Sequence, residues 1–185
     1  RILFDEVNIT FSPGNCYGII GANGAGKSTF LKILSKQMEG NSGSVILEPG
    51  KRLSVLEQEH NRYDTNNVLE TVILGNKELF DIKKQIDDLY ANENFSDEDA
   101  ERVGELQIKY EEMDGWNAEA DAAYLLSSLG IKEELHQSMM NSIDQKVKVK
   151  VLLAQCIFGN PDVLIMDEPT NDLDYNSVEW LVNFI

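Results

Sequence analysis

The first part of the chain carries the polar and apolar pattern of β-strands. Alternation or short apolar runs predict strands at 7–11, 16–20, 45–47 and 53–56. The run at 16–20 is typical of a strand that is buried on both faces. A helix is predicted at 28–36, because Phe30, Leu31, Ile33 and Leu34 recur at helical spacing.

From residue 68 to 129 the apolar spacing becomes helical. Two stripes follow a 3-4-3 spacing, namely Leu79, Ile82, Ile86 and Leu89, and Val103, Leu106, Tyr110 and Met113. Ser96, before three acidic residues, is the expected N-cap of the second helix. Two such stripes joined by a short polar loop predict an antiparallel hairpin at about 76–114, and mutual packing explains their apolar positions.

A helix at 147–158 and a strand at 163–166 complete the pattern. The predicted fold is therefore α/β, with a mixed sheet, flanking helices and an inserted helical subdomain. We expect the first part of the core at 1–67, the helical subdomain at 68–142 and the second part of the core at 143–185.

The composition restricts the function further. The chain has 185 residues and a formal net charge of −16, which argues against binding to nucleic acid or membrane surfaces through bulk charge. No segment is long and apolar enough to insert into a membrane. Cys16 and Cys156 lack metal-type spacing and are interpreted as buried, reduced thiols of a cytoplasmic protein. The chain starts without Met and stops inside an apolar run, so we expect a fragment.

A glycine-rich loop between a strand and a helix carries the strongest chemical signal. The octapeptide from Gly21 to Ser28 fits G-x-x-x-x-G-K-[ST], a loop whose backbone N–H groups face phosphate oxygens. Lys27 would reach the β and γ phosphates of ATP, and Ser28 would coordinate Mg²⁺. The predicted nucleotide-binding residues are Gly21, Ala22, Asn23, Gly24, Ala25, Gly26, Lys27, Ser28 and Thr29.

A second signal is the acidic pair at the end of the strand at 163–166. Ligands of α/β sheets bind at the carboxyl ends of strands, where Asp167 would join the Mg²⁺ shell. Glu168 would be the general base that orients the attacking water, so Glu168 and Lys27 are the predicted catalytic residues. Alone the pair could be a solvated turn, but a phosphate loop 140 residues earlier (167 − 27) favours the catalytic interpretation.

Together these motifs resemble those of ABC ATPases. Residues 21–29 are similar to the Walker A motif, and residues 167–174 are similar to Walker B and the D-loop. Gln58 falls where the family has its Q-loop glutamine, which implies contact with the nucleotide and Mg²⁺. Residues 14–18, 152–155 and 159–162 and the hairpin resemble the first domain of ABC-F proteins, soluble proteins with two fused ATPase domains. The resemblance implies a second ATP-binding domain as partner, in the same chain or in a dimer, and a role at the ribosome.

The chain departs from that family at the signature motif. Where the family has Leu-Ser-Gly-Gly-Glu/Gln, residues 143–147 read Ile-Asp-Gln-Lys-Val. The resemblance implies that a signature caps ATP bound to the partner domain, where the Asp144 carboxylate would repel phosphate. We therefore expect one competent and one impaired composite site, unless the segment is an artefact of the sequence record. The family's adenine-stacking aromatic residue and switch histidine would lie outside the chain, so the fragment should hydrolyse ATP poorly; His60 and His136 are expected at the surface.

Two other functions stay open. A transporter's nucleotide-binding subunit would share these motifs, but usually has a shorter helical subdomain. The altered signature would suit a nucleotide-gated, non-hydrolytic binding module, which Glu168 argues against. Residues 76–120 hold 14 acidic and 5 basic residues, a net charge of −9, so the hairpin is a poor match for RNA and a better one for basic proteins or solvent.

Overall fold

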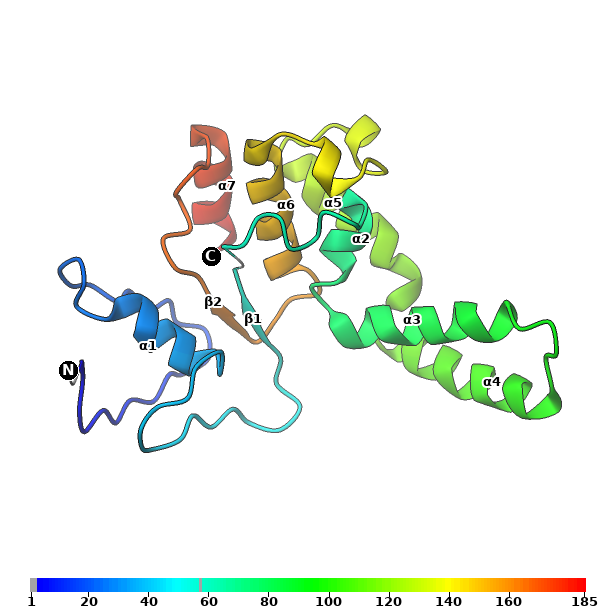
Figure 1. Cartoon of the computed structure of the whole chain (residues 1–185), viewed down its shortest axis with the longest axis horizontal. Coiled ribbons are helices and arrows are strands. Elements are labelled where there is room, and N and C mark those ends of the chain that lie inside the picture. The colour runs from blue at the N-terminus through cyan, green and yellow to red at the C-terminus, as the bar shows by residue number, and fades with distance from the viewer. Residues whose placement is uncertain (1–2, 57) are drawn as a thin grey trace.

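The computed structural model describes residues 3–56 and 58–185. Figure 1 shows a helical body above a short sheet, with α1 on one side and a helical hairpin extending away on the other. The α-helices are α1 (Lys27–Leu34), α2 (Val68–Ile73), α3 (Lys77–Tyr90), α4 (Asp97–Glu112), α5 (Ala118–Ser128), α6 (Gln145–Ile157) and α7 (Tyr175–Phe184). The strands are β1 (Leu53–Val55) and β2 (Val163–Ile165), and 3-10 turns lie at Gly115–Asn117, Glu133–Leu135 and Met140–Ser142.

The sheet joins the two parts of the chain that flank the helices. β1 and β2 are parallel, with Ser54 opposite Leu164. Asp162 fixes the start of this pair, because its carboxylate accepts from the Arg52 backbone N–H at 2.8 Å and from Lys51 Nζ at 2.8 Å. The Lys51 ammonium lowers the pKa of the Asp162 carboxyl below its ordinary value. Both strands therefore end at the same edge, where Gln58 and Asp167 follow them.

The predicted mixed sheet is wrong in its extent. Within the described residues, β1 and β2 are the strands, and the segments 7–11, 16–20 and 45–47 form none. Their apolar side chains are largely exposed, with Ile20 at 98% and Ile46 at 87%. The local pattern reports which side chains share a face, but a strand also requires a hydrogen-bonded neighbour, and these segments have none in the sheet.

The core lies between α2, α5 and α6. α6 is buried along nearly its whole length, from Lys148 to Ile157 except for the half-buried Lys150. Side chains with almost no exposure form one cluster there, including Val68, Val72, Leu126, Met140, Val151 and Leu153. Burial of large aliphatic side chains stabilises a fold by about 1.5–3 kcal/mol each, so α6 is the rigid element to which the flanking segments attach.

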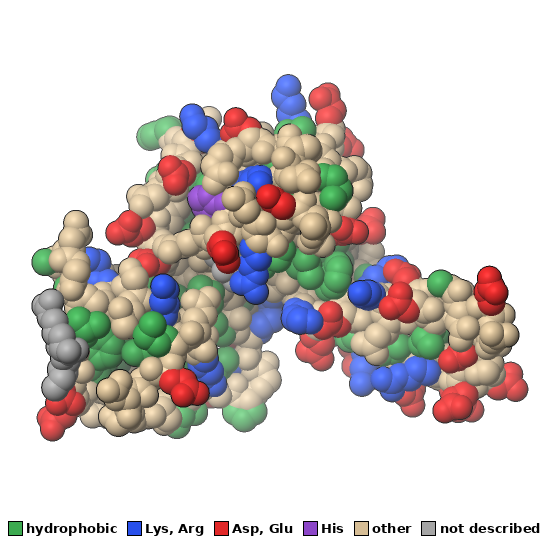
Figure 2. All heavy atoms as spheres, in the orientation of Figure 1, with side chains coloured by type: hydrophobic (Ala, Val, Ile, Leu, Met, Phe, Trp, Pro, Cys, Tyr) green, Lys and Arg blue, Asp and Glu red, His purple; other side chains and the backbone are tan. Residues whose placement is uncertain are grey.

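The predicted hairpin is present. α3 and α4 pack against each other, and six stripe residues are buried between them and their neighbours: Leu79, Ile82, Ile86, Val103, Leu106 and Tyr110. Ser96 caps α4 as expected, since its hydroxyl oxygen accepts from the Asp99 N–H at 3.1 Å and the Asp99 carboxylate accepts from the Ser96 N–H at 2.9 Å. Figure 2 shows acidic side chains gathered at the far end of this hairpin.

Two side chains lie elsewhere than the sequence predicts. His136 is buried, and its Nε2 lies 3.3 Å from the Ile131 carbonyl oxygen. His136 is buried because a backbone hydrogen bond holds this segment against α2: the His136 carbonyl accepts from the Leu69 N–H at 2.9 Å. Cys16 is exposed, since the segment that carries it forms no strand, whereas Cys156 on α6 is buried as predicted.

Asp174 fastens α7 to α6. Its carboxylate accepts from the Ser177 N–H at 2.9 Å as the N-cap of α7, and pairs with Lys150 Nζ of α6 at 2.6 Å. The hydrogen bond from Lys150, followed by that from the Ser177 N–H, lowers the pKa of Asp174 from 3.8 to about 2. The ionised carboxylate therefore stabilises the folded chain.

We predict a pH-dependent loss of stability in Asp174→Asn. The amide retains a capping oxygen but loses the charge that pairs with Lys150. Because the folded pKa is depressed, the wild-type advantage is fully present above pH 4 and disappears as the pH falls toward about 2. Urea denaturation of both proteins across this range measures the difference, with Asp121→Asn on the exposed side of α5 as the control. An advantage that is constant with pH would contradict the assignment.

Candidate nucleotide site

The predicted phosphate loop leads directly into α1. Gly26 is the residue before the helix and has a φ of 101°, and Gly24 has a φ of 78°. Side chains rarely adopt these left-handed values, so the loop needs glycine at both positions. A Cβ on Gly26 would also lie 3.4 Å from Leu3 Cβ. The backbone thus adopts a tight curve at a helix N-terminus, which suits a phosphate group.

Lys27 lies within this curve. Its Nζ donates to the carbonyl oxygens of Gly21 at 2.9 Å and Ala22 at 3.2 Å. The ammonium is therefore held beside the loop backbone, at the position from which it can contact an anion in the loop. The remaining loop residues, Asn23, Ala25 and Thr29, keep their predicted places in the loop and the first turn of α1.

A cavity of about 170 Å³ brings together the three predicted Mg²⁺ residues. Ser28 comes from α1, Gln58 from the segment after β1 and Asp167 from the end of β2. The cavity is completed by Leu31, Lys32, Ser35, Gln37, Val55, Leu56, Glu59 and Ile165. Hydroxyl, amide and carboxylate oxygens are the ligands that Mg²⁺ prefers, with phosphate oxygens and water in its other positions. The residues present therefore fit Mg²⁺ with a nucleotide.

Glu168 directly follows Asp167, which lines that cavity. Its side chain does not line the cavity, and its Oε2 accepts from Asn171 Nδ2 at 2.7 Å. Its φ is 49°, an uncommon value for a residue with a side chain. Strained backbone of this kind occurs often at functional sites, and here it turns the chain sharply after β2.

The altered signature begins α6. Asp144 is the N-cap, and its Oδ1 accepts from the Lys146 N–H at 2.8 Å. The Asp144 carboxylate is thereby committed to a helix N-terminus, the position that an anionic ligand would otherwise occupy. Gln145 Nε2 contacts His60 Nδ1, which directs this side chain toward the segment that follows Gln58.

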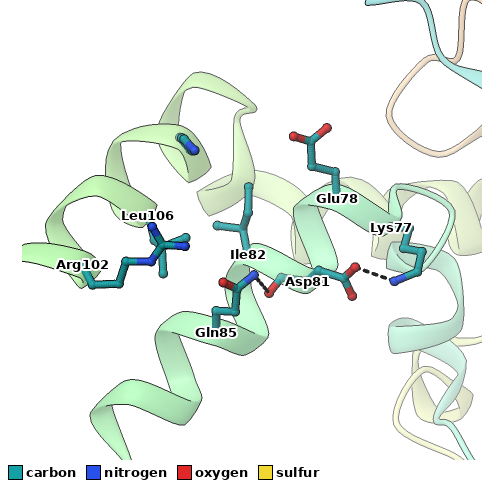
Figure 3. Close-up of a pocket in the computed structure, with 8 residues that line it drawn as sticks. Lys77, Glu78, Asp81, Ile82, Gln85, Arg102 and Leu106 are labelled. Atoms are coloured by element: carbon teal, nitrogen blue, oxygen red, sulfur yellow. Dashed lines mark hydrogen bonds and ion pairs between the residues drawn. The ribbon is translucent and has the colours of Figure 1, made fainter. Parts of the chain in front are cut away.

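A larger groove of about 430 Å³ lies on the hairpin, away from these motifs. Figure 3 shows its residues from α3 and α4, with Asp81 paired to Lys77 and its carbonyl accepting from Gln85. The groove contains none of the predicted nucleotide residues, and its ion pairs join neighbours along one helix at the surface. Such pairs contribute little to stability or recognition, so the smaller cavity is the candidate site.

Sequence reasoning missed two sets of residues around the site. Arg52 binds the carbonyl oxygens of Gly75 at 2.9 Å and Phe158 at 2.7 Å, and so joins the connection between α2 and α3 to the C-terminal end of α6. Lys148 binds the segment after Gln58. The available signal was a lysine within an apolar helix, since a buried ammonium requires a specific partner.

The chain is similar to known ATP-binding proteins. A family model described as "ABC transporter" matches residues 4–171. The "Uncharacterized ABC transporter ATP-binding protein YkpA" of Bacillus subtilis (strain 168) is 52% identical over 185 residues, which are 100% of this chain and 34% of that protein. The "Probable ATP-binding protein YbiT" of Escherichia coli O157:H7 is 46% identical over 179 residues, covering 97% of this chain and 34% of that protein.

The name of a third relative refers to translation. The "Energy-dependent translational throttle protein EttA" of Mycobacterium tuberculosis (strain ATCC 25618 / H37Rv) is 30% identical over 187 residues, covering 98% of this chain and 32% of that protein. The chain thus spans about a third of the length of these relatives. No helix within residues 3–56 and 58–185 combines the length and apolarity needed to cross a membrane. The family match and these relatives show that the chain belongs to the ABC ATPase family and is related to its ABC-F-type ATP-binding proteins.

Proposed function

We propose that this chain binds ATP with Mg²⁺ and, together with a second ATP-binding domain, hydrolyses it to drive closure of the two domains. The observation that carries the proposal is the cavity shared by Ser28, Gln58 and Asp167 at the first turn of α1. Three segments that are distant in the chain present oxygen ligands there, next to a loop whose glycines adopt the curve that phosphate binding needs.

The roles of the residues follow from their positions. The loop 21–29 would hold the phosphates through backbone N–H groups, and Lys27 would offset their charge. Ser28, Gln58 and Asp167 would hold Mg²⁺, which supplies electrostatic stabilisation of the transferred phosphoryl group. Glu168 would accept a hydrogen bond from the attacking water and orient it. The bond from Asn171 Nδ2 engages only Oε2, and a carboxylate can accept further hydrogen bonds, so this bond is compatible with that role.

The wider role that we propose is that of an ABC-F-type factor acting in translation in the cytoplasm. Its support is the alignment of 98% of the chain with EttA, whose name assigns it to translation. Residues 68–142 would form the inserted helical subdomain, with the hairpin as its arm. The net charge of −9 at 76–120 favours contact of this arm with basic protein surfaces over contact with RNA.

A transporter subunit is the second candidate. The description of the family model and the name of YkpA favour it. A long hairpin with a net negative charge is an unusual feature for that role. The non-hydrolytic module is the third candidate, and it would require Glu168 to be without a catalytic function.

The binding of ATP is tested with Lys27→Ala. We expect the wild-type chain to bind MgATP in an equilibrium fluorescence titration, and the variant to lose about 30- to 150-fold in affinity, because charge-assisted hydrogen bonds contribute about 2–3 kcal/mol. Lys84→Ala removes the same charge from an exposed position on α3 and should bind like wild type. Equal affinities of the two variants, or no binding by wild type, would refute the proposal.

A further inference from the structure

We propose that Lys148 is a positioning residue that fixes the segment carrying Gln58 against the first turns of α6. The inference rests on the proposed function and deepens it, because it assigns a support to one side of the Mg²⁺ site. It concerns the loop 58–66, which connects β1 to α2 and contains no helix or strand.

Contacts with α6 hold the middle of the loop, while at its end the Asn66 carbonyl accepts from the Met140 N–H at 2.9 Å. Its own hydrogen bonds are turns, such as that from the Arg62 N–H to the Glu59 carbonyl at 3.1 Å. Lys148 Nζ, by contrast, donates to Asn61 Oδ1 at 3.0 Å and forms an ion pair with Asp64. One ammonium therefore joins two positions of the loop to a single point on α6.

The burial of Lys148 makes this contact specific. Its side chain is 7% exposed, whereas that of Asp64 is 35% exposed. A buried ammonium is stable only with charged and hydrogen-bonding partners, so the loop must keep Asn61 and Asp64 in place whenever α6 is folded. A second contact, between Gln145 and His60, lies one turn earlier on the same helix.

The consequence for the site is geometric. Gln58 is exposed and lies two residues before His60, so its own surroundings do little to fix it. It nevertheless lines the cavity together with Ser28 and Asp167, which belong to a helix and a strand end. The contacts with α6 supply the missing constraint, as supporting residues do around metal ligands in general. They also connect the start of α6 with the Mg²⁺ side of the cavity.

The experiment uses Lys148→Met, which keeps the length and removes the charge. The Mg²⁺ concentration needed for half-maximal ATP binding should rise about tenfold, the effect of losing a support of a metal ligand. ATP binding without Mg²⁺ should be unchanged, because the loop 21–29 is distant from Lys148 in the chain and Lys148 donates instead to Asn61 and Asp64. Amide exchange at 59–64 should accelerate, while exchange in α2 and α5 should not.

Three comparisons make the result decisive. Lys148→Arg should restore the wild-type Mg²⁺ requirement, since a guanidinium can bind the same two oxygens, and Lys84→Met should never change it. Asn61→Ala removes one contact without exposing a buried charge, so it should raise the requirement less and tests the inference even if Lys148→Met does not fold. An unchanged Mg²⁺ requirement in Asn61→Ala, or in a folded Lys148→Met, would overturn the inference. Absence of ATP binding by wild type would instead overturn the proposed function.

Discussion

Glu168→Gln should bind MgATP as tightly as wild type and lose at least a hundredfold in kcat when it is placed in the full-length protein. The amide has nearly the same shape but cannot accept the proton of the attacking water, and general-base catalysis contributes about 10²–10⁴-fold. Release of inorganic phosphate measures the loss, and an equilibrium titration measures binding. Glu179→Gln, at an exposed position on α7, is the matched control and should retain full turnover.

The size of this loss also tests the asymmetry of the two composite sites. If the altered start of α6 impairs the site that it faces, nearly all turnover comes from the site with Glu168, and the variant should lose nearly all of it. A loss of only about half would mean that the other site is active despite Asp144.

The same variant holds ATP without cleaving it, so its co-sedimentation with ribosomes tests the translational role. Failure to co-sediment with ATP bound would speak against that role.

Gly75→Ala should be among the most damaging single substitutions in the chain. A Cβ at this position would lie 1.9 Å from the carbonyl oxygen of Gln155 and 2.9 Å from its carbonyl carbon. The clash is with the backbone of α6, which is buried and cannot move away. We expect a loss of about 3 kcal/mol or more in the free energy of unfolding, or no folded protein at all, as measured by urea denaturation.

Gly104→Ala is the control for that prediction. Gly104 lies inside α4, and a Cβ there would meet nothing within 4 Å. Because alanine favours the helix over glycine, this variant should gain about 0.5–1 kcal/mol. If both variants were equally stable, the close approach of residue 75 to α6 would not exist in solution.

The features that were predicted correctly from the sequence are those that depend on residues close together in the chain. The α3–α4 stripes, the Ser96 cap and the glycine loop before α1 are local patterns, and each is present. The grouping of Ser28 with Asp167 followed from a general rule about strand ends. The extent of the sheet did not follow, because alternation at 7–11 contains no information about a pairing partner. The support from Lys148 is equally non-local, since its partners lie 87 and 84 residues away.

The order in which the chain folds follows from the β1–β2 pair. Leu53 pairs with Val163, 110 residues later (163 − 53), and this gap includes the whole α3–α4 hairpin. Contacts between close neighbours form early, and contacts that close long loops form late. On a translating ribosome the hairpin can therefore fold while β2 is still unsynthesised. Gln58 and Asp167 meet only after that closure, so the nucleotide site is among the last parts of the chain to assemble.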